Sequence, residues 1–263
     1  LMKDFYDEEK YVKAKNYAKE KGRISLISST LSTVITILFL VFKGYGWLDS
    51  IIANNYDISF LQSGLFFLTL FILSDFISIP FSCYNTFVIE EKYGFNKTTV
   101  KTFVIDKIKG YVLTLTIGGG LLAASLYLVS ILVNGFWLWL WIGLAILMLF
   151  INMFYADIIV PIFNKLTPLE MGSLRDKIEA YSKKVGYSLK NIYIIDGSKR
   201  SSKANAFFSG LGPRKTIALY DTLVEKHSEE ELVAVLAHEV GHFKKKHVFT
   251  SIFLTIFQLG LMC

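Results

Sequence analysis

The sequence has 263 residues, of which 53% are hydrophobic and 19% are charged, with a mean hydropathy of +0.45. Soluble domains contain about 45–50% apolar and about 25% charged residues, and here the apolar excess is collected into long uncharged runs. The net charge of +6 accompanies no nucleic-acid-binding motif, and the two cysteines form no Cys-x-x-Cys pair. Composition therefore excludes a disulfide framework, argues against a nucleic-acid partner, and indicates that the lipid bilayer is a partner.

The first part of the chain alternates between charged and apolar segments. Residues 1–23 are highly charged helix formers, and Ile24–Phe42 then contains 19 uncharged residues, which is long enough to cross a bilayer. Residues 43–57 are predicted to form a short loop with interfacial aromatic residues. Ile58–Ile89 carries one charge, Asp75. Two interpretations of Asp75 stay open: a functional intramembrane carboxylate, or a residue near the membrane interface.

A polar stretch over 90–110 precedes Tyr111–Ala156, an uncharged run about twice as long as one membrane span. Asn134-Gly135 in the middle of this run is a turn signal, so a helical hairpin is expected. The N-terminal domain, residues 1–165, is therefore predicted to cross the membrane four times, at about residues 24–42, 60–80, 111–133 and 136–156.

The second domain, residues 166–263, is predicted to be α+β. One helix and two strands are expected before residue 228: Leu174–Val185, Asn191–Ile195 and Thr216–Tyr220. Ser228 and Glu231 have the spacing of a capping box, which predicts the start of a further helix. We expect that helix to run on without a break and to enter the membrane as another span at about residue 248.

The distribution of basic residues predicts the orientation in the membrane. Residues 1–23 hold seven lysines and arginines and residues 90–110 hold five, whereas 43–57 holds one. Because cytoplasmic loops are enriched in lysine and arginine, the two basic segments and residues 157–247 are predicted to lie on the cytoplasmic side.

His238, Glu239 and His242 form a His-Glu-x-x-His pattern within the last predicted helix. Residues four apart share one helix face, so both imidazoles are placed to bind a zinc ion. Zinc lowers the pKa of a bound water to about 7, and Glu239 is placed to remove the proton from that water. The pattern predicts a zinc-dependent protease in which metal-activated water attacks a peptide carbonyl, with Glu239 as general base.

A catalytic zinc site needs a third protein ligand. Glu229–Glu231 lie about two turns before His238 on the predicted helix, from where they cannot easily reach the metal. We therefore expect the third ligand beyond Cys263, in a longer protein of which this chain is an internal fragment. The fragment alone is expected to bind zinc poorly and to have little or no activity.

Four motifs in the same order resemble those of the CAAX prenyl protease 1 family: Asn85–Asn96, Pro161–Glu170, Asp196–Ser202 and Ala237–His242. The resemblance covers nearly the whole chain. It implies an integral-membrane zinc protease with seven membrane helices around a large water-filled chamber, which cleaves after a prenylated C-terminal cysteine. The expected fold is a multi-span α-helical membrane protein with an inserted α+β, zincin-like metalloprotease domain, truncated in this chain.

The resemblance also implies roles that spacing does not. Asn205, Ala206 and Phe207 match a family motif in which an edge strand aligns the substrate backbone, although a plain edge strand stays an alternative. The family's first membrane helix is expected before Leu1. The third ligand, a glutamate, is expected after Cys263, together with a catalytic arginine and histidine.

Two other functions remain as alternatives. A membrane quality-control metalloprotease shares the metal motif, but such proteases usually have fewer spans before the metal helix. A non-catalytic chamber that binds lipidated peptides would suit the spans, but it needs no general base such as Glu239. The expected location is the plasma membrane in a bacterium, or the endoplasmic reticulum and nuclear envelope in a eukaryote.

Overall fold

The structure is a computed structural model that describes residues 7–132, 134–186, 191–209, 216–245 and 247–262. Within these ranges, seven side chains lie outside the described part: those of Phe208, Glu239, His242, Phe243, Lys244, His247 and Val248. The residues group into two compact units, Leu1–Thr98 with Ile117–Ala123, and Thr99–Thr116 with Ala124–Cys263.

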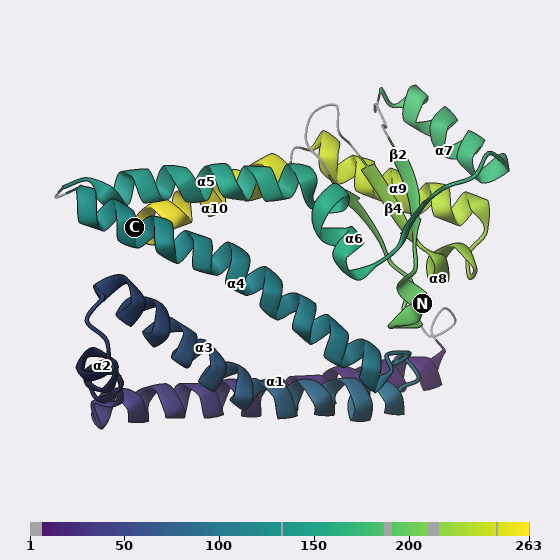
Figure 1. The fold of residues 1–263 in the computed structure, drawn as a ribbon. Coiled ribbons are helices and arrows are strands. Elements are labelled where there is room, and N and C mark those ends of the chain that lie inside the picture. Colours follow the sequence, from purple (N-terminus) through teal and green to yellow (C-terminus); the bar gives the residue numbers. More distant parts are fainter. Residues whose placement is uncertain (1–6, 133, 187–190, 210–215, 246, 263) are drawn as a thin grey trace. The chain divides into compact units, whose positions relative to one another are not determined.

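The first unit is built from helices (Figure 1). In chain order these are α1 (Glu8–Val41), α2 (Gly44–Asn55), α3 (Ser59–Tyr84) and the π-helix η1 (Asn85–Glu90). Asp7 caps the start of α1: its carboxylate accepts hydrogen bonds from Glu9 N at 3.1 Å and Lys10 N at 3.2 Å. This cap satisfies backbone amides that have no partner within the helix. The charged N-terminal segment and the first apolar segment therefore form one continuous helix.

Helix α2 occupies residues where the sequence predicted a loop. Lys43 has a positive φ of 54°, which turns the chain between α1 and α2. Leu48 and Ile52, one helical turn apart, are buried, whereas Trp47 is 65% exposed. A short helix gains most of its stability from packing one apolar face, and two such residues in a short segment give a weak sequence signal. The prediction of a loop over 43–57 is therefore wrong.

The polar part of α1 is tied to the chain that follows α3. Glu90 accepts hydrogen bonds from Tyr17 Oη at 2.6 Å and from Lys21 Nζ at 3.1 Å. Glu20 on α1 accepts a hydrogen bond from Lys92 Nζ at 2.6 Å. These contacts give the acidic and basic residues of the Asn85–Asn96 motif a structural role within the first unit.

The second unit joins helices to a small sheet (Figure 1). Its elements are α4 (Val100–Ile131, of which 117–123 group with the first unit), α5 (Phe136–Phe154), the π-helix η2 (Tyr155–Ile159), α6 (Val160–Phe163), β1 (Leu166–Pro168), α7 (Ser173–Lys184), β2 (Asn191–Ile195), the 3₁₀ turn η3 (Gly197–Lys199), β3 (Ala206–Ser209), β4 (Thr216–Tyr220), α8 (Asp221–Val224), α9 (Glu229–Lys244) and α10 (His247–Met262). Both strands and the helix expected before residue 228 are confirmed, as β2, β4 and α7.

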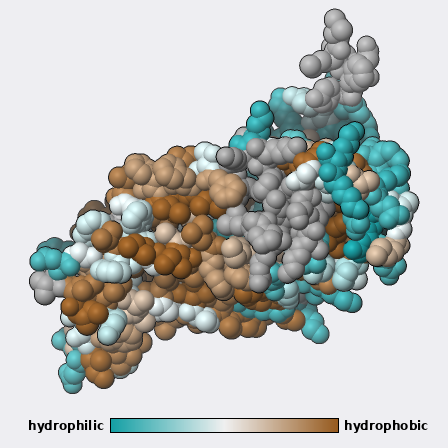
Figure 2. Space-filling model, turned by 90° about the horizontal axis from the view of Figure 1, so that it is seen from above, coloured by the Kyte–Doolittle hydropathy of each residue, from teal (hydrophilic) through white to brown (hydrophobic). Residues whose placement is uncertain are grey.

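Among the residues that the structure describes, four helical stretches are long and apolar enough to cross a membrane: Glu8–Val41, Ser59–Glu90, Val100–Ile131 and Phe136–Phe163. At most 11% of the apolar window of any of them is buried within the structure. Figure 2 shows hydrophobic residues gathered over the long helices and hydrophilic residues over the α+β region. Helices that expose so much apolar surface, with their backbone groups paired internally, suit a lipid environment.

The sheet has the strand order β1-β2-β4-β3. β2 and β4 are parallel in the centre, and β1 and β3 are antiparallel at the edges. One core cluster joins the sheet to α7, α8 and α9, through Leu169, Ile178, Ile192, Ile217, Leu219, Leu223, Leu232, Leu236 and Val240. Burial of each such side chain contributes about 1.5–3 kcal/mol, so this cluster fixes α9 against the sheet.

Gly197 lies where η3 meets the end of β4, and a larger residue is expected to destabilise this junction. A Cβ atom on Gly197 would lie 2.0 Å from Tyr220 Cδ1 and 2.7 Å from Cε1. Gly197→Ala is expected to cost about 1–3 kcal/mol, as overpacking does. Thermal unfolding of the full-length protein in detergent measures this cost. Gly22→Ala is the control, because a Cβ there meets no atom within 4 Å; equal unfolding midpoints for the two variants would contradict the prediction.

The C-terminal helix differs from the expectation of one unbroken helix. α9 ends at Lys244 and a separate helix, α10, begins at His247. The sequence has three consecutive lysines, Lys244–Lys246, at the junction of the two helices. α10 has 16 residues, so a further membrane span near residue 248 stays a prediction.

Candidate functional site

Helix α9 carries the His-Glu-x-x-His pattern, and its first turn has the predicted capping box. Ser228 N donates to Glu231 Oε2 at 2.9 Å, and Glu231 N donates to Ser228 Oγ at 3.3 Å. The two residues thus satisfy each other's backbone amides at the helix start, an arrangement that contributes about 1 kcal/mol. The beginning of the candidate catalytic helix is therefore fixed by its own sequence.

Exposed ion pairs link helix α7 to the same end of α9. Lys177 Nζ lies 2.7 Å from Glu229 Oε2 and 2.6 Å from Glu230 Oε1. Hydrogen bonds from Lys177 and from Ser173 hold the pKa of Glu229 below its ordinary value. Negative charge in the first turn also complements the helix dipole. Because these side chains are largely exposed, the ion pairs contribute little to the stability or the placement of α9.

The sides of α9 divide into a core face and an open face. Leu232, Leu236 and Val240, spaced four residues apart, are 2%, 1% and 1% exposed. His238 lies two residues from both Leu236 and Val240, a rotation of about 200°, and its side chain is exposed. His242 is one turn further along the same face of the helix. Packing of α9 against the sheet therefore turns the two histidine positions away from the core.

The structure describes the candidate metal site in part. The side chains of Glu239 and His242 lie outside the described part, so their places follow from the helical backbone alone. Among the described side chains there is no group of three metal-ligating residues. The exposed His238, with α9 unbroken through His242, fits a pair of imidazole ligands on one helix face.

The residues predicted to bind substrate lie at and beside the edge strand β3. Ala206 and Phe207 are in β3, and Asn205 directly precedes it. Tyr220 N donates to Asn205 O at 3.0 Å, so alternation along an antiparallel pair turns the backbone groups of Ala206 away from β4. Asn205 Oδ1 accepts a hydrogen bond from Ala206 N at 2.9 Å. A peptide strand that pairs with β3 would displace the Asn205 carboxamide from this amide.

The other end of β3 contacts η2, which follows α5. The rings of Tyr155 and Phe207 lie edge to face with centroids 5.9 Å apart, and Ala156 N donates to Ser209 Oγ at 3.3 Å. The edge strand is therefore held close to the end of an apolar helix.

Sequence reasoning missed one cluster near this strand, the ion pair between Arg200 and Asp106. The two residues are 94 positions apart, and Asp106 stands in a segment rich in lysine. A single sequence contains no signal that pairs residues at such a separation. The Asp196–Ser202 motif marked Arg200 as part of a resemblance only.

Both parts of the chain match known protein families. Residues 1–165 match the family described as CAAX prenyl protease N-terminal, five membrane helices, and residues 168–263 match peptidase family M48. Probable CAAX prenyl protease 1 of Schizosaccharomyces pombe is 38% identical, over 99% of this chain and 57% of its own length. CAAX prenyl protease 1 of Saccharomyces cerevisiae is 35% identical, over 96% and 58%, respectively.

The solved structures give the same result. The crystal structure of S. mikatae Ste24p matches with a TM-score of 0.91 and 34% identity, over 99% of this chain and 62% of that one. The chain thus spans about three fifths of the length of these relatives. Within the described residues it contains four helices long enough to cross a membrane, where the family description names five. The chain is an integral, multi-pass membrane protein, and it belongs to the CAAX prenyl protease family.

Proposed function

We propose that this chain carries the catalytic helix of a zinc-dependent membrane endopeptidase that removes the C-terminal tripeptide from prenylated CAAX proteins. The observation that carries the proposal is α9, one helix that holds His238 and His242 on the side away from its buried residues, with Glu239 next to His238 along the chain. Relatives named CAAX prenyl protease 1 match nearly the whole chain, which supports this substrate class.

His238 and His242 would hold the zinc ion as neutral imidazoles, and a glutamate beyond Cys263 is the proposed third ligand. When bound, zinc supplies an activated water at neutral pH and stabilises the negative charge that develops on the peptide carbonyl oxygen. A helix supports this arrangement because residues four apart have nearly the same direction. The rigid packing of α9 would keep both imidazoles in place without a further scaffold.

Glu239 is the proposed general base. Its carboxylate would take a proton from the attacking water and pass it to the nitrogen of the leaving amine. Because Glu239 directly follows His238 in the helix, its carboxylate and the first metal ligand share one rigid support. Glu239 would thus carry out both proton transfers that hydrolysis of the peptide bond requires.

The edge strand β3 is the proposed site of substrate alignment. A substrate in extended conformation would pair with the outward backbone groups of Ala206, while Asn205 would exchange its present hydrogen bond for one to the peptide. β3 contacts both η2 and α9. A peptide on β3 would therefore run between an apolar helix and the catalytic helix.

The α+β region is proposed to face the cytoplasm, because the lysine- and arginine-rich segments belong on that side. In a eukaryote, the resemblance implies the endoplasmic reticulum and nuclear envelope; in a bacterium, the plasma membrane is expected. The relatives named above come from yeasts, which favours the eukaryotic location.

Cleavage of matched peptides tests the proposal. A peptide with a prenylated CAAX cysteine is expected to lose three residues when incubated with the full-length protein in detergent. The same peptide without the prenyl group is expected to have at least about tenfold lower kcat/KM, because loss of only two buried CH₂ groups, ~0.8 kcal/mol each, has that effect. Mass spectrometry identifies the products.

Two outcomes would contradict the proposal. Equal cleavage of both peptides, with preference for misfolded membrane proteins, would identify a quality-control protease. Binding of the prenylated peptide without cleavage by zinc-loaded protein would identify a binding chamber.

A further inference from the structure

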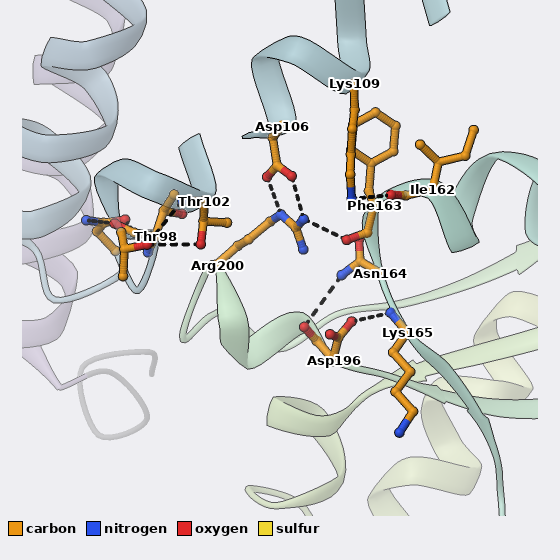
Figure 3. A network of polar contacts seen from close by, with 12 residues as sticks. Thr98, Thr102, Asp106, Lys109, Ile162, Phe163, Asn164, Lys165, Asp196 and Arg200 are labelled. Atoms are coloured by element: carbon orange, nitrogen blue, oxygen red, sulfur yellow. Dashed lines mark hydrogen bonds and ion pairs between the residues drawn. The ribbon is translucent and has the colours of Figure 1, made fainter. Parts of the chain in front are cut away.

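The connection between β2 and β3 contains Arg200, which lies in the Asp196–Ser202 motif and has no part in the chemistry proposed above. Arg200 Nε donates to Asp106 Oδ2 at 2.6 Å and Nη2 donates to Asp106 Oδ1 at 2.8 Å (Figure 3). Nη2 also donates to the carbonyl oxygen of Phe163 at 2.7 Å. One side chain of the sheet region thus holds both the beginning of the apolar helix α4 and the end of α6.

Neighbouring contacts fasten the same junction from both sides (Figure 3). Asp196 Oδ1 accepts a hydrogen bond from Lys165 N at 2.7 Å, and Asn164 Nδ2 donates to Asp196 O at 3.5 Å. Lys109, one turn after Asp106 on α4, donates to Ile162 O at 2.7 Å. The segment that connects α6 to β1 is therefore hydrogen-bonded both to α4 and to the β2–β3 connection.

Four residues separate Arg200 from Asn205, and hydrogen bonds restrain the backbone of this segment. Arg200 N donates to Gly197 O at 3.0 Å, so the residue is part of the η3 turn. Thr222 Oγ1 donates to Lys203 O at 2.9 Å, and Tyr220 N donates to Asn205 O at 3.0 Å. Because the connection has little slack, a shift of Arg200 relative to α4 would move the start of β3.

The ion pair is partly buried and has a defined geometry. The side chains of Arg200 and Asp106 are 22% and 24% exposed, so water screens them less than it screens the ion pairs on the surface of α7. The hydrogen bond to Asp106 raises the pKa of the Arg200 guanidinium above its ordinary value. Two parallel hydrogen bonds between a guanidinium and a carboxylate also fix orientation, which a lysine in place of Arg200 would not do.

We propose that Arg200 is a positioning residue that, through Asp106, sets the place of the edge strand β3 relative to the membrane helix α4. This proposal rests on the proposed function. A prenylated substrate would be held by its lipid beside the membrane helices and by its backbone at β3, so the spacing between α4 and β3 would select the peptide bond that reaches Glu239. A strand advances about 3.3 Å per residue, so a small displacement changes which bond is cleaved.

The test compares Asp106→Asn, Arg200→Gln and the exchanged pair Asp106→Arg/Arg200→Asp in the full-length protein. Both single variants are expected to yield products cut one or two residues from the normal bond, and to lose up to about 10²-fold in kcat at that bond, as misplacement by about 1 Å does. The exchanged pair is expected to restore the normal product. Lys183→Gln removes an exposed charge of the same unit and is expected to leave the products unchanged.

A distance measurement separates this proposal from the proposed function. Spin labels at Lys101→Cys on α4 and Ala204→Cys before β3, both exposed positions, report the spacing without any cleavage, in a background without other cysteines. Asp106→Asn is expected to shift or broaden the distance distribution, and the exchanged pair to restore it. An unchanged distribution, or an unchanged set of products in folded, zinc-loaded single variants, would overturn the positioning role. Inactivity of the unmodified protein together with a shifted distribution would instead refute the proposed function alone.

Discussion

Replacement of Glu239 by glutamine is expected to lower peptide cleavage by about 10²–10⁴-fold, the usual contribution of a general acid–base residue. Glutamine has nearly the same shape as glutamate but cannot accept a proton from water at neutral pH. The loss is expected in kcat, with little change in KM, because β3 and not Glu239 is proposed to bind the peptide. Steady-state cleavage of the prenylated peptide measures both constants.

The control for this variant lies on the same helix. Glu230 is exposed in the first turn of α9 and pairs with Lys177. Glu230→Gln removes one carboxylate from α9 without touching the metal motif, so it is expected to keep full activity. The zinc content of both variants should equal that of the unmodified protein. If Glu239→Gln cleaves at the normal rate, the assignment of the general base is wrong.

Removal of the metal is expected to abolish cleavage and to destabilise the protein. Chelation should bring kcat to background, and added zinc should restore it. Because a ligand that binds only the folded state adds stability, about 2.7 kcal/mol at a concentration 100 times its Kd, the unfolding midpoint should also fall. Zinc content, peptide cleavage and thermal unfolding, all measured on one sample of the full-length protein, check this result.

Two histidine variants give the matched comparison. His238→Ala is expected to reduce bound zinc and activity together, since it removes a proposed ligand. His227, which is exposed and precedes α9, contacts Glu231 at 3.5 Å and has no proposed role in metal binding. His227→Ala should therefore retain one zinc per chain. Normal zinc content in His238→Ala would show that other residues bind the metal.

The features of the fold that could be predicted are those that depend on residues close together in the sequence. The capping box of Ser228 and Glu231 depends on residues three apart, and the structure contains both of its backbone hydrogen bonds. β2 and β4 match their predicted limits because short apolar runs bounded by turn residues leave few alternatives. In each case the decisive interactions lie within a few residues of one another.

Features that depend on tertiary packing could not be predicted. Burial of Leu48 and Ile52 stabilises α2. The mixed polarity of this segment gives no sequence pattern from which the helix could be predicted. The π-helices η1 and η2 continue α3 and α5 without a distinct sequence pattern. The metal motif could be located from residue types alone, yet the open face of α9 is defined by the burial of Leu232, Leu236 and Val240 against the sheet.

The ion pair between Asp106 and Arg200 also has a consequence for synthesis of the chain. Asp106 leaves the ribosome 94 residues before Arg200. At about 5–20 residues per second, translation delays its partner by about 5–20 s. Helices α4 and α5 can therefore insert before the arginine that joins α4 to the sheet region exists. Assembly would proceed in two stages, membrane insertion first and docking of the newly made sheet second, with the ion pair among the last contacts to form.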